Sequence, residues 1–233
     1  MINLKCGDCL ELLKDIPNGS IDLVVTDPPY EIIATNGGGS QGHKVKQVMD
    51  ECEGLNILNG FDKRVLDECM RVMKKPNIYI WCNARQIPMY LNYFVTERKC
   101  NFDILVWIKD NPVPTYSNKY MTDKEYCLYF RRGGYCNPKD FASARTWFME
   151  PLNAKDKAKY RHPTIKPQWM IERLVQNSCP DGGTVLDPFM GSGTSGAAAV
   201  SRGVNFIGFE INPEYFNIAS ERINNEEKNI TLF

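Results

Sequence analysis

The tetrapeptide Asp27-Pro28-Pro29-Tyr30 combines residue types that could hold a flat molecule carrying an amino group. Asp27 offers a carboxylate, Tyr30 offers an aromatic face, and the prolines supply carbonyl oxygens but no N–H donor. Because proline fixes φ, the pair also stiffens the turn. A nucleobase with an exocyclic amine has the shape and the donors that such a turn would hold. The tetrapeptide is therefore the first candidate for a catalytic site.

A second candidate site lies where an apolar run leads into a glycine turn and the start of a helix. The segment reads Asp187-Pro188-Phe189-Met190-Gly191-Ser192-Gly193-Thr194. Glycines at such a turn let a ligand approach the backbone closely, and a helix N-terminus favours an anion. About twenty residues later, Glu210 ends another apolar run and could hold both hydroxyls of a ribose. These features predict a nucleoside cofactor with a carboxylate or phosphate.

Two other classes of nucleotide-binding site also contain a glycine turn. A nucleoside triphosphate is disfavoured because no lysine follows Gly193, as a Walker A motif requires. The glycines at 191, 193 and 196 do match the spacing of a dinucleotide fingerprint, although an Asp-Pro pair at the strand end is unusual for it. A nucleotide-binding oxidoreductase therefore stays open as an alternative, but it leaves the first tetrapeptide unexplained.

Taken together, the motifs resemble those of the DNA amino-methyltransferases, which use S-adenosylmethionine to methylate adenine N6 or cytosine N4. Three further segments carry the resemblance, residues 4–11, 162–167 and 208–215, so that it runs from residue 4 to about 222. The Asp-Pro-Pro-Tyr motif precedes the cofactor motif, as in the circularly permuted group called beta. The resemblance implies a Rossmann-like methyltransferase fold: a seven-stranded, mostly parallel sheet with one antiparallel strand.

The resemblance also implies catalytic roles. The Asp27 carboxylate and the Pro28 carbonyl would accept the amine protons and free the nitrogen lone pair, with Pro29 completing the turn and Tyr30 stacking on an extruded base. No nucleophile and no metal is required. Asp rather than Ser at position 27 favours adenine N6, with cytosine N4 as the alternative and an inactive DNA-binding relative as another. Cytosine C5 chemistry is excluded because the chain has no Pro-Cys dipeptide.

The implied cofactor residues surround S-adenosylmethionine. Asp187 would face the methionyl amino group, Glu210 the ribose, and Phe189 the adenosine, with Gly191 and Gly193 permitting close approach. Asp8 would bind the adenine amine of the cofactor. The remaining expected contacts come from Thr164 and Lys166, near the methionine carboxylate, and from Pro188, Ser192 and Thr194.

The elements that must position these residues can be predicted from periodicity. Strand-like and helical runs alternate, which indicates an α/β fold with a mostly parallel sheet covered on both faces. No clear helix separates two of the runs, 102–109 and 125–131, so they are expected to pair antiparallel. The strand runs are 2–6, 21–26, 77–82, 102–109, 125–131, 184–187 and 205–210, and the helical runs are 9–15, 61–74, 85–97, 168–178, 194–202 and 213–225.

Charge is unevenly distributed, although 28 basic residues balance 28 acidic ones. Residues 109–173 hold 13 Lys and Arg against 7 Asp and Glu, a net charge of +6 that the rest of the chain offsets. A basic segment on a neutral protein can form a phosphate-binding surface, though a solvated loop would have the same composition. Double-stranded DNA is the expected partner, with contacts from Lys155, Lys157, Lys159, Arg161 and His162.

The 233 residues predict a single methyltransferase domain, 1–233, with insertions at 31–59, a substrate loop, and at 110–166, a region facing DNA. Neither a signal peptide nor a membrane-spanning run is seen, and nine scattered cysteines indicate reduced thiols, so a cytoplasmic protein is expected. The Cys6-Gly7-Asp8-Cys9 segment lacks a second pair for zinc. By family analogy only, a homodimer and a cognate restriction endonuclease are expected partners.

Overall fold

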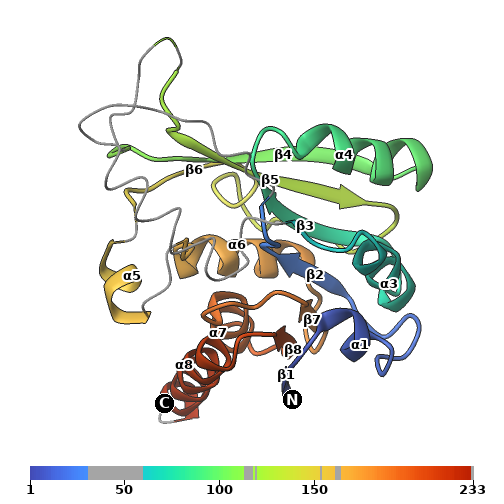
Figure 1. Ribbon diagram of the computed structural model, residues 1–233, viewed down its shortest axis with the longest axis vertical. Helices are drawn as coiled ribbons and strands as arrows, with labels where there is room; N and C mark the ends of the chain where they lie inside the picture. Colours follow the sequence, from blue (N-terminus) through green and yellow to red (C-terminus); the bar gives the residue numbers. More distant parts are fainter. Residues whose placement is uncertain (31–59, 113–117, 119, 153, 161–163, 232–233) are drawn as a thin grey trace.

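The computed structural model describes residues 1–30, 60–112, 118, 120–152, 154–160 and 164–231. Eight strands form one sheet in the order β1-β8-β7-β2-β3-β5-β4-β6 (Figure 1). The predicted substrate loop, 31–59, lies outside the described residues. The strands are β1 Ile2–Cys6, β2 Leu23–Thr26, β3 Asn77–Cys82, β4 Asn101–Ile108, β5 Lys124–Arg131, β6 Trp147–Met149, β7 Thr184–Asp187 and β8 Asn205–Glu210.

The expected fold class is confirmed, because the sheet is parallel except at β5. That strand runs antiparallel to both of its neighbours, β3 and β4, so the predicted antiparallel pairing of the runs 102–109 and 125–131 is confirmed. The sheet has one strand more than the seven expected. The three-residue β6 pairs in parallel with the end of β4, in a segment expected to be irregular.

Helices cover both faces of the sheet, which makes three layers (Figure 1). Helices α6, α7 and α8 pack on one face with side chains such as Val25 and Val185, and α1, α3, α4 and η1 pack on the other with side chains such as Val24 and Leu186. The alternation along each buried strand follows from the period of two in a pleated strand. The bounds are α1 Cys9–Leu13, α3 Arg64–Val72, α4 Ile87–Leu91, π-helix η1 Asn92–Glu97, α5 Ala154–Tyr160, α6 Gln168–Ser178, α7 Thr194–Ser201 and α8 Pro213–Thr231.

Each predicted helical run contains a helix, and the short α5 adds one within the segment expected to be irregular. Asn212 caps α8, since its Oδ1 accepts from the backbone N–H of Glu214 at 2.8 Å. Gly203 follows α7 with φ of 69°, as expected after a helix C-terminus. None of the helices among the described residues is long and apolar enough to span a bilayer.

The two candidate sites meet because β2 and β7 are parallel neighbours in the middle of the sheet. Helix α7, which connects β7 to β8, packs on one face of the sheet. Helix α3, which lies between β2 and β3 in the sequence, packs on the opposite face. Such a divergence opens a crevice at the carboxyl ends of the strands, where doubly wound sheets bind their ligands. The strand ends Thr26 and Asp187 lie at this crevice.

Candidate functional site

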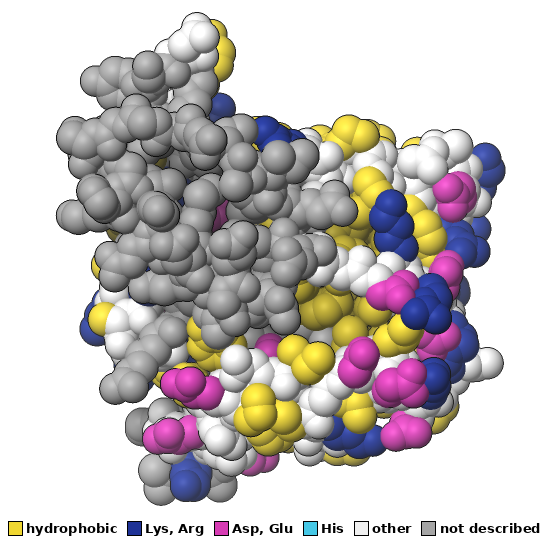
Figure 2. All heavy atoms as spheres, in the orientation of Figure 1, with side chains coloured by type: hydrophobic (Ala, Val, Ile, Leu, Met, Phe, Trp, Pro, Cys, Tyr) yellow, Lys and Arg dark blue, Asp and Glu magenta, His cyan; other side chains and the backbone are white. Residues whose placement is uncertain are grey.

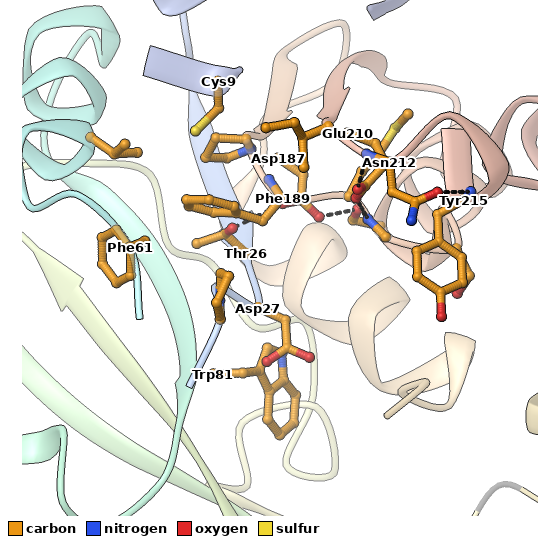
Figure 3. Close-up of a pocket in the computed structure, with 18 of the residues that line it drawn as sticks. Cys9, Thr26, Asp27, Phe61, Trp81, Asp187, Phe189, Glu210, Asn212 and Tyr215 are labelled. Carbon is orange, nitrogen blue, oxygen red and sulfur yellow. Dashed lines mark hydrogen bonds between the residues drawn. The ribbon is translucent and has the colours of Figure 1, made fainter. Parts of the chain in front are cut away.

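A cavity of about 470 Å³ lies at the carboxyl ends of β2, β3, β7 and β8. Figure 3 shows Asp27 and Trp81 at one end of it, Glu210 and Asn212 toward the other, and Asp187 with Phe189 between them. One cavity therefore joins the two motifs, although 160 residues separate Asp27 from Asp187.

Asp187 is buried, with 4% of its surface exposed, at the centre of this cavity. Its Oδ1 accepts from the Thr26 hydroxyl at 2.9 Å and from the Phe189 N–H at 3.0 Å, and its Oδ2 accepts from the Ser195 hydroxyl at 2.5 Å. All three donors are neutral. Burial raises the pKa of this carboxyl to about 7, against the opposing effect of the three hydrogen bonds. A cationic ligand group would supply the charge that these donors lack.

Glu210 ends β8 at the other side of the cavity. Its two oxygens accept from the backbone N–H groups of Gly191 and Asn212, each at 2.9 Å, which fixes the carboxylate beside the glycine turn. Asp8 also lines the cavity, and its Oδ1 caps α1 by accepting from the Leu10 N–H at 2.8 Å. A local structural role therefore already accounts for one Asp8 oxygen.

Two aromatic rings flank the region between these acids. Phe189 packs edge-on against Phe61, with ring centroids 5.5 Å apart, and both rings line the cavity (Figure 3). An apolar slot with carboxylates at its rim can hold a purine and hydrogen-bond the attached ribose. The residues present thus fit a nucleoside such as the one in S-adenosylmethionine.

The two glycines of the turn serve different purposes. Gly191 lines the cavity and has φ of 51°, so it can let a ligand approach. Gly193 is not among the lining residues. It has φ of 78°, and a Cβ there would lie 2.9 Å from the Cα and Cβ of Ala219 in α8. The structure thus supports Gly193 as the residue that lets α7 pack on α8, whereas the sequence indicated contact with the cofactor.

The Asp27 carboxylate is already held by two donors. Its Oδ2 accepts from the Lys166 ammonium at 2.5 Å, and its Oδ1 accepts from the Tyr30 hydroxyl at 2.8 Å. Burial raises the pKa of this carboxyl, and the charge of Lys166 opposes that shift. Lys166, expected at the cofactor carboxylate, lines the cavity together with Thr164, and its ammonium contacts the Asp27 carboxylate.

Lys166 also belongs to a larger group of charged side chains. Its Nζ also lies 3.1 Å from Oε2 of Glu125 in β5, and the other oxygen of Glu125 lies 2.6 Å from the Lys109 ammonium. Although burial acts to raise it, the pKa of Glu125 is lowered by the charges of the two lysines. Burial likewise opposes the charge of Lys166, but the two carboxylates keep its pKa above the usual value.

The predicted DNA contacts are not part of this cavity. Lys155, Lys157 and Lys159 lie on α5, which has no buried residue, and Tyr160 of the same helix stacks under the guanidinium of Arg222 in α8 at 4.3 Å. Arg161 and His162 lie outside the described residues. On the right of Figure 2, basic and acidic side chains alternate, so that part of this face offers no basic surface.

Several lining or supporting residues were missed by the sequence analysis. Trp81, only 1% exposed, lines the cavity on the side of Asp27. The hydroxyls of Ser195 and Thr26 donate hydrogen bonds to Asp187. Position at the carboxyl end of β3, next to β2, is the signal that could have found Trp81. No local pattern marks Glu125, because its partners come from other elements.

The comparisons with known proteins agree with this geometry. The family described as DNA methylase, the N6/N4 methyltransferases, matches residues 21–221. The type II methyltransferase M.HinfI of Haemophilus influenzae is 29% identical over 93% of this chain and 67% of its own length. M2.LlaDCHI of Lactococcus lactis subsp. cremoris is 30% identical over 94% of this chain and 87% of its own.

Solved structures show the same architecture. The complex of M1.HpyAVI with SAM superposes with a TM-score of 0.69 at 25% identity, covering 95% of this chain and all of that one. The cytosine-N4-specific PvuII DNA methyltransferase reaches a TM-score of 0.71 at 17% identity over 98% of this chain and 92% of its own, which concerns the fold alone. The family match removes the oxidoreductase alternative. The chain belongs to the N6/N4 family of DNA methylases and is an S-adenosylmethionine-dependent DNA methyltransferase.

Proposed function

We propose that the protein transfers a methyl group from S-adenosylmethionine to the exocyclic N6 of adenine in double-stranded DNA, after the base has rotated out of the helix. The observation that carries the proposal is that Asp27, at the first position of its motif, opens into the same cavity as Asp187 and Glu210. An acid at this position, rather than serine, favours adenine over cytosine within the family.

The catalytic half of the site activates the amine. Its nitrogen is a poor nucleophile because its lone pair is delocalised into the ring. The Asp27 carboxylate and the Pro28 carbonyl accept hydrogen bonds from its two N–H groups, which draws the nitrogen toward tetrahedral geometry and frees the lone pair. The Tyr30 hydroxyl already donates to Asp27 Oδ1, so the amine either shares this oxygen with it or replaces it. The ring of Tyr30 stacks on the base.

The cofactor supplies an electrophilic methyl group on a sulfonium sulfur. Asp187 pairs with the amino group of its methionine part, Glu210 holds the ribose, and Phe189 with Phe61 enclose the adenine. The chain thereby orients two ligands within one cavity, and proximity and alignment lower the barrier without a protein nucleophile. In the described part of the chain, no group of three or more His, Cys, Asp or Glu side chains is arranged to hold a metal ion. The proposed transfer needs none.

The DNA is held by basic residues outside the cavity in this proposal. The lysines of α5, together with Arg161 and His162, contact phosphates, a sequence-independent interaction that positions the duplex. The whole chain, 1–233, acts as one domain, with 110–166 as its DNA-facing region. We further propose a homodimer, a paired restriction endonuclease that makes no contact with it, and action in the cytoplasm of a bacterial or phage-infected cell.

Methylation of mixed-sequence DNA tests the proposal. Purified protein and tritiated S-adenosylmethionine are incubated with DNA, the nucleosides are separated, and sequencing that detects modified bases reports the context. N6-methyladenine is the expected product, and Asp27→Ala should abolish it. N4-methylcytosine would refute the adenine assignment, whereas no methylated base in any DNA would indicate an inactive relative.

A further inference from the structure

We propose that Lys166 and Glu125 are positioning residues for the catalytic acid: Lys166 fixes the orientation and charge of the Asp27 carboxylate, and Glu125 fixes Lys166. The inference rests on the proposed function in one respect, namely that Asp27 receives the target amine. It differs from the family-based expectation, which places Lys166 on the cofactor.

The geometry is a chain of ionic contacts from four different segments. Lys166 precedes α6 and is 4% exposed, and its ammonium lies 2.5 Å from Asp27 and 3.1 Å from Glu125. Glu125 begins the antiparallel strand β5 and also contacts Lys109, at 2.6 Å. The indole ring of Trp81 lies 5.2 Å from the same Lys166 ammonium. A lysine so enclosed has little freedom to point elsewhere.

The donors of Lys166 are directed at neighbours within the protein. An ammonium has three N–H groups. They donate to the Asp27 carboxylate and, at longer range, to the Tyr30 hydroxyl at 3.4 Å and the Thr164 carbonyl at 3.5 Å. The Glu125 carboxylate is held at 3.1 Å as an ion pair. A cofactor carboxylate could attract the lysine only at the expense of these contacts. The site therefore supports an action of Lys166 on Asp27.

The charges balance, with two carboxylates and two ammonium groups. Removing one member of a buried ion pair leaves a charge without compensation, which is costly. The groups whose charges act on Asp27 have opposite effects: the ammonium favours its ionised form, and the second carboxylate disfavours it. The titratable groups that face or act on Asp27 are Lys166, Glu125, Tyr30, Cys82, Cys127 and Asp187.

This opposition gives the proposal a directional test in the full-length protein. The variants are Lys166→Met, Glu125→Gln and the double variant, which neutralises both positions. The Asp27 carboxyl is titrated by ¹³C NMR with labelled aspartate and assigned by its absence in Asp27→Asn. We expect its midpoint to rise by about one pH unit or more in Lys166→Met and to fall in Glu125→Gln, as removal of a nearby charge requires.

The double variant is expected to titrate between the two single variants, and it supplies the measurement should Lys166→Met fail to fold. Midpoints of the folded single variants that stay within 0.3 unit of wild type (a threshold of about 0.4 kcal/mol), or that move in the same direction, would overturn the proposal, and so would a double variant whose midpoint does not lie above that of Glu125→Gln. A cooperative urea melt followed by circular dichroism reports whether each variant is folded.

Kinetics separate a positioning role from a cofactor role. In Lys166→Met we expect the acidic limb of the kcat–pH profile to move with the Asp27 midpoint, and the Kd for S-adenosylhomocysteine to change less than about twofold. An unmoved limb with a tenfold weaker Kd would place Lys166 on the cofactor and overturn the proposal. Should wild type methylate no DNA while the midpoints shift oppositely, the proposed function fails and the positioning chain stands.

Discussion

Replacing Asp187 by asparagine should remove the pH dependence of cofactor binding. The carboxyl is buried among neutral donors, the Thr26 and Ser195 hydroxyls and the Phe189 N–H, and its pKa is raised to about 7. In the proposed complex it pairs with the amino group of the methionine part, which requires the ionised form. Binding must therefore expel a proton wherever the free protein holds one, below about pH 7.

The magnitude follows from that value. Below pH 7 the apparent affinity of wild type should fall tenfold per pH unit, and at pH 5.5 it should be about 30-fold weaker than at pH 8. At pH 6 close to one proton should be released per ligand bound. Asp187→Asn should bind equally well from pH 5.5 to 8, but about 10- to 100-fold more weakly than wild type at pH 8, the size of one charge-assisted hydrogen bond of roughly 1.5–3 kcal/mol.

Isothermal titration calorimetry with S-adenosylhomocysteine measures both quantities, because repeating the titration in buffers of different ionisation enthalpy gives the protons released. A flat affinity for wild type between pH 5.5 and 8 would refute the reasoning, and so would a slope that survives in Asp187→Asn. The stability of the free protein should change with pH in the opposite direction to its affinity for the cofactor. Since the folded state binds this proton more tightly than the unfolded chain, free wild type should lose stability as pH rises from about 4 to 7, and the variant should lose less.

Three shorter predictions test other parts of the site. Tyr30→Phe keeps the ring and frees an oxygen of Asp27, so the KM of this variant for DNA should not rise. Tyr30→Ala removes the ring, and because stacking contributes roughly 1–3 kcal/mol, it should raise KM or lower kcat by about tenfold in the same assay. In a urea melt, Gly193→Ala should lose about 1–3 kcal/mol more stability than Gly203→Ala, because both positions have positive φ but only a Cβ at 193 meets Ala219, at 2.9 Å. Charge-neutral substitution of each α5 lysine should reduce the slope of log K against log salt by about one, and an unchanged slope would remove α5 from the DNA contacts.

The fold could be predicted because its strands are apolar runs and its helices are amphipathic. The two elements that the sequence did not predict are short. The strand β6, Trp147–Met149, has only three residues and forms because the edge of β4 offers it hydrogen bonds. The helix α5, Ala154–Tyr160, buries no residue and has no apolar face to reveal it. Short elements of this kind carry no periodic signal of their own.

The site could be predicted where its chemistry is local. Asp187 and Glu210 are each the last residue of a strand, β7 and β8. Because these strands are parallel neighbours, both residues lie at the same edge of the sheet. Lys166 shows the limit, because its motif marks it as important but its contacts are decided by Glu125, 41 positions earlier on β5. A contact between segments that no local pattern links emerges only when the sheet is assembled.

Asp27 and Asp187, two of the acids that line the cavity, lie in opposite surroundings, and this difference fits two different tasks. Asp187 has only neutral donors and a raised pKa, so its negative charge is unsatisfied until a cationic ligand arrives. Asp27 has a lysine at 2.5 Å, so it is already paired and can accept an amine without first attracting a cation. Two carboxylates in one pocket can serve different purposes when their environments differ. Exchanging these environments, with a neutral partner at 166 and a cation beside Asp187, should weaken both cofactor binding and amine activation.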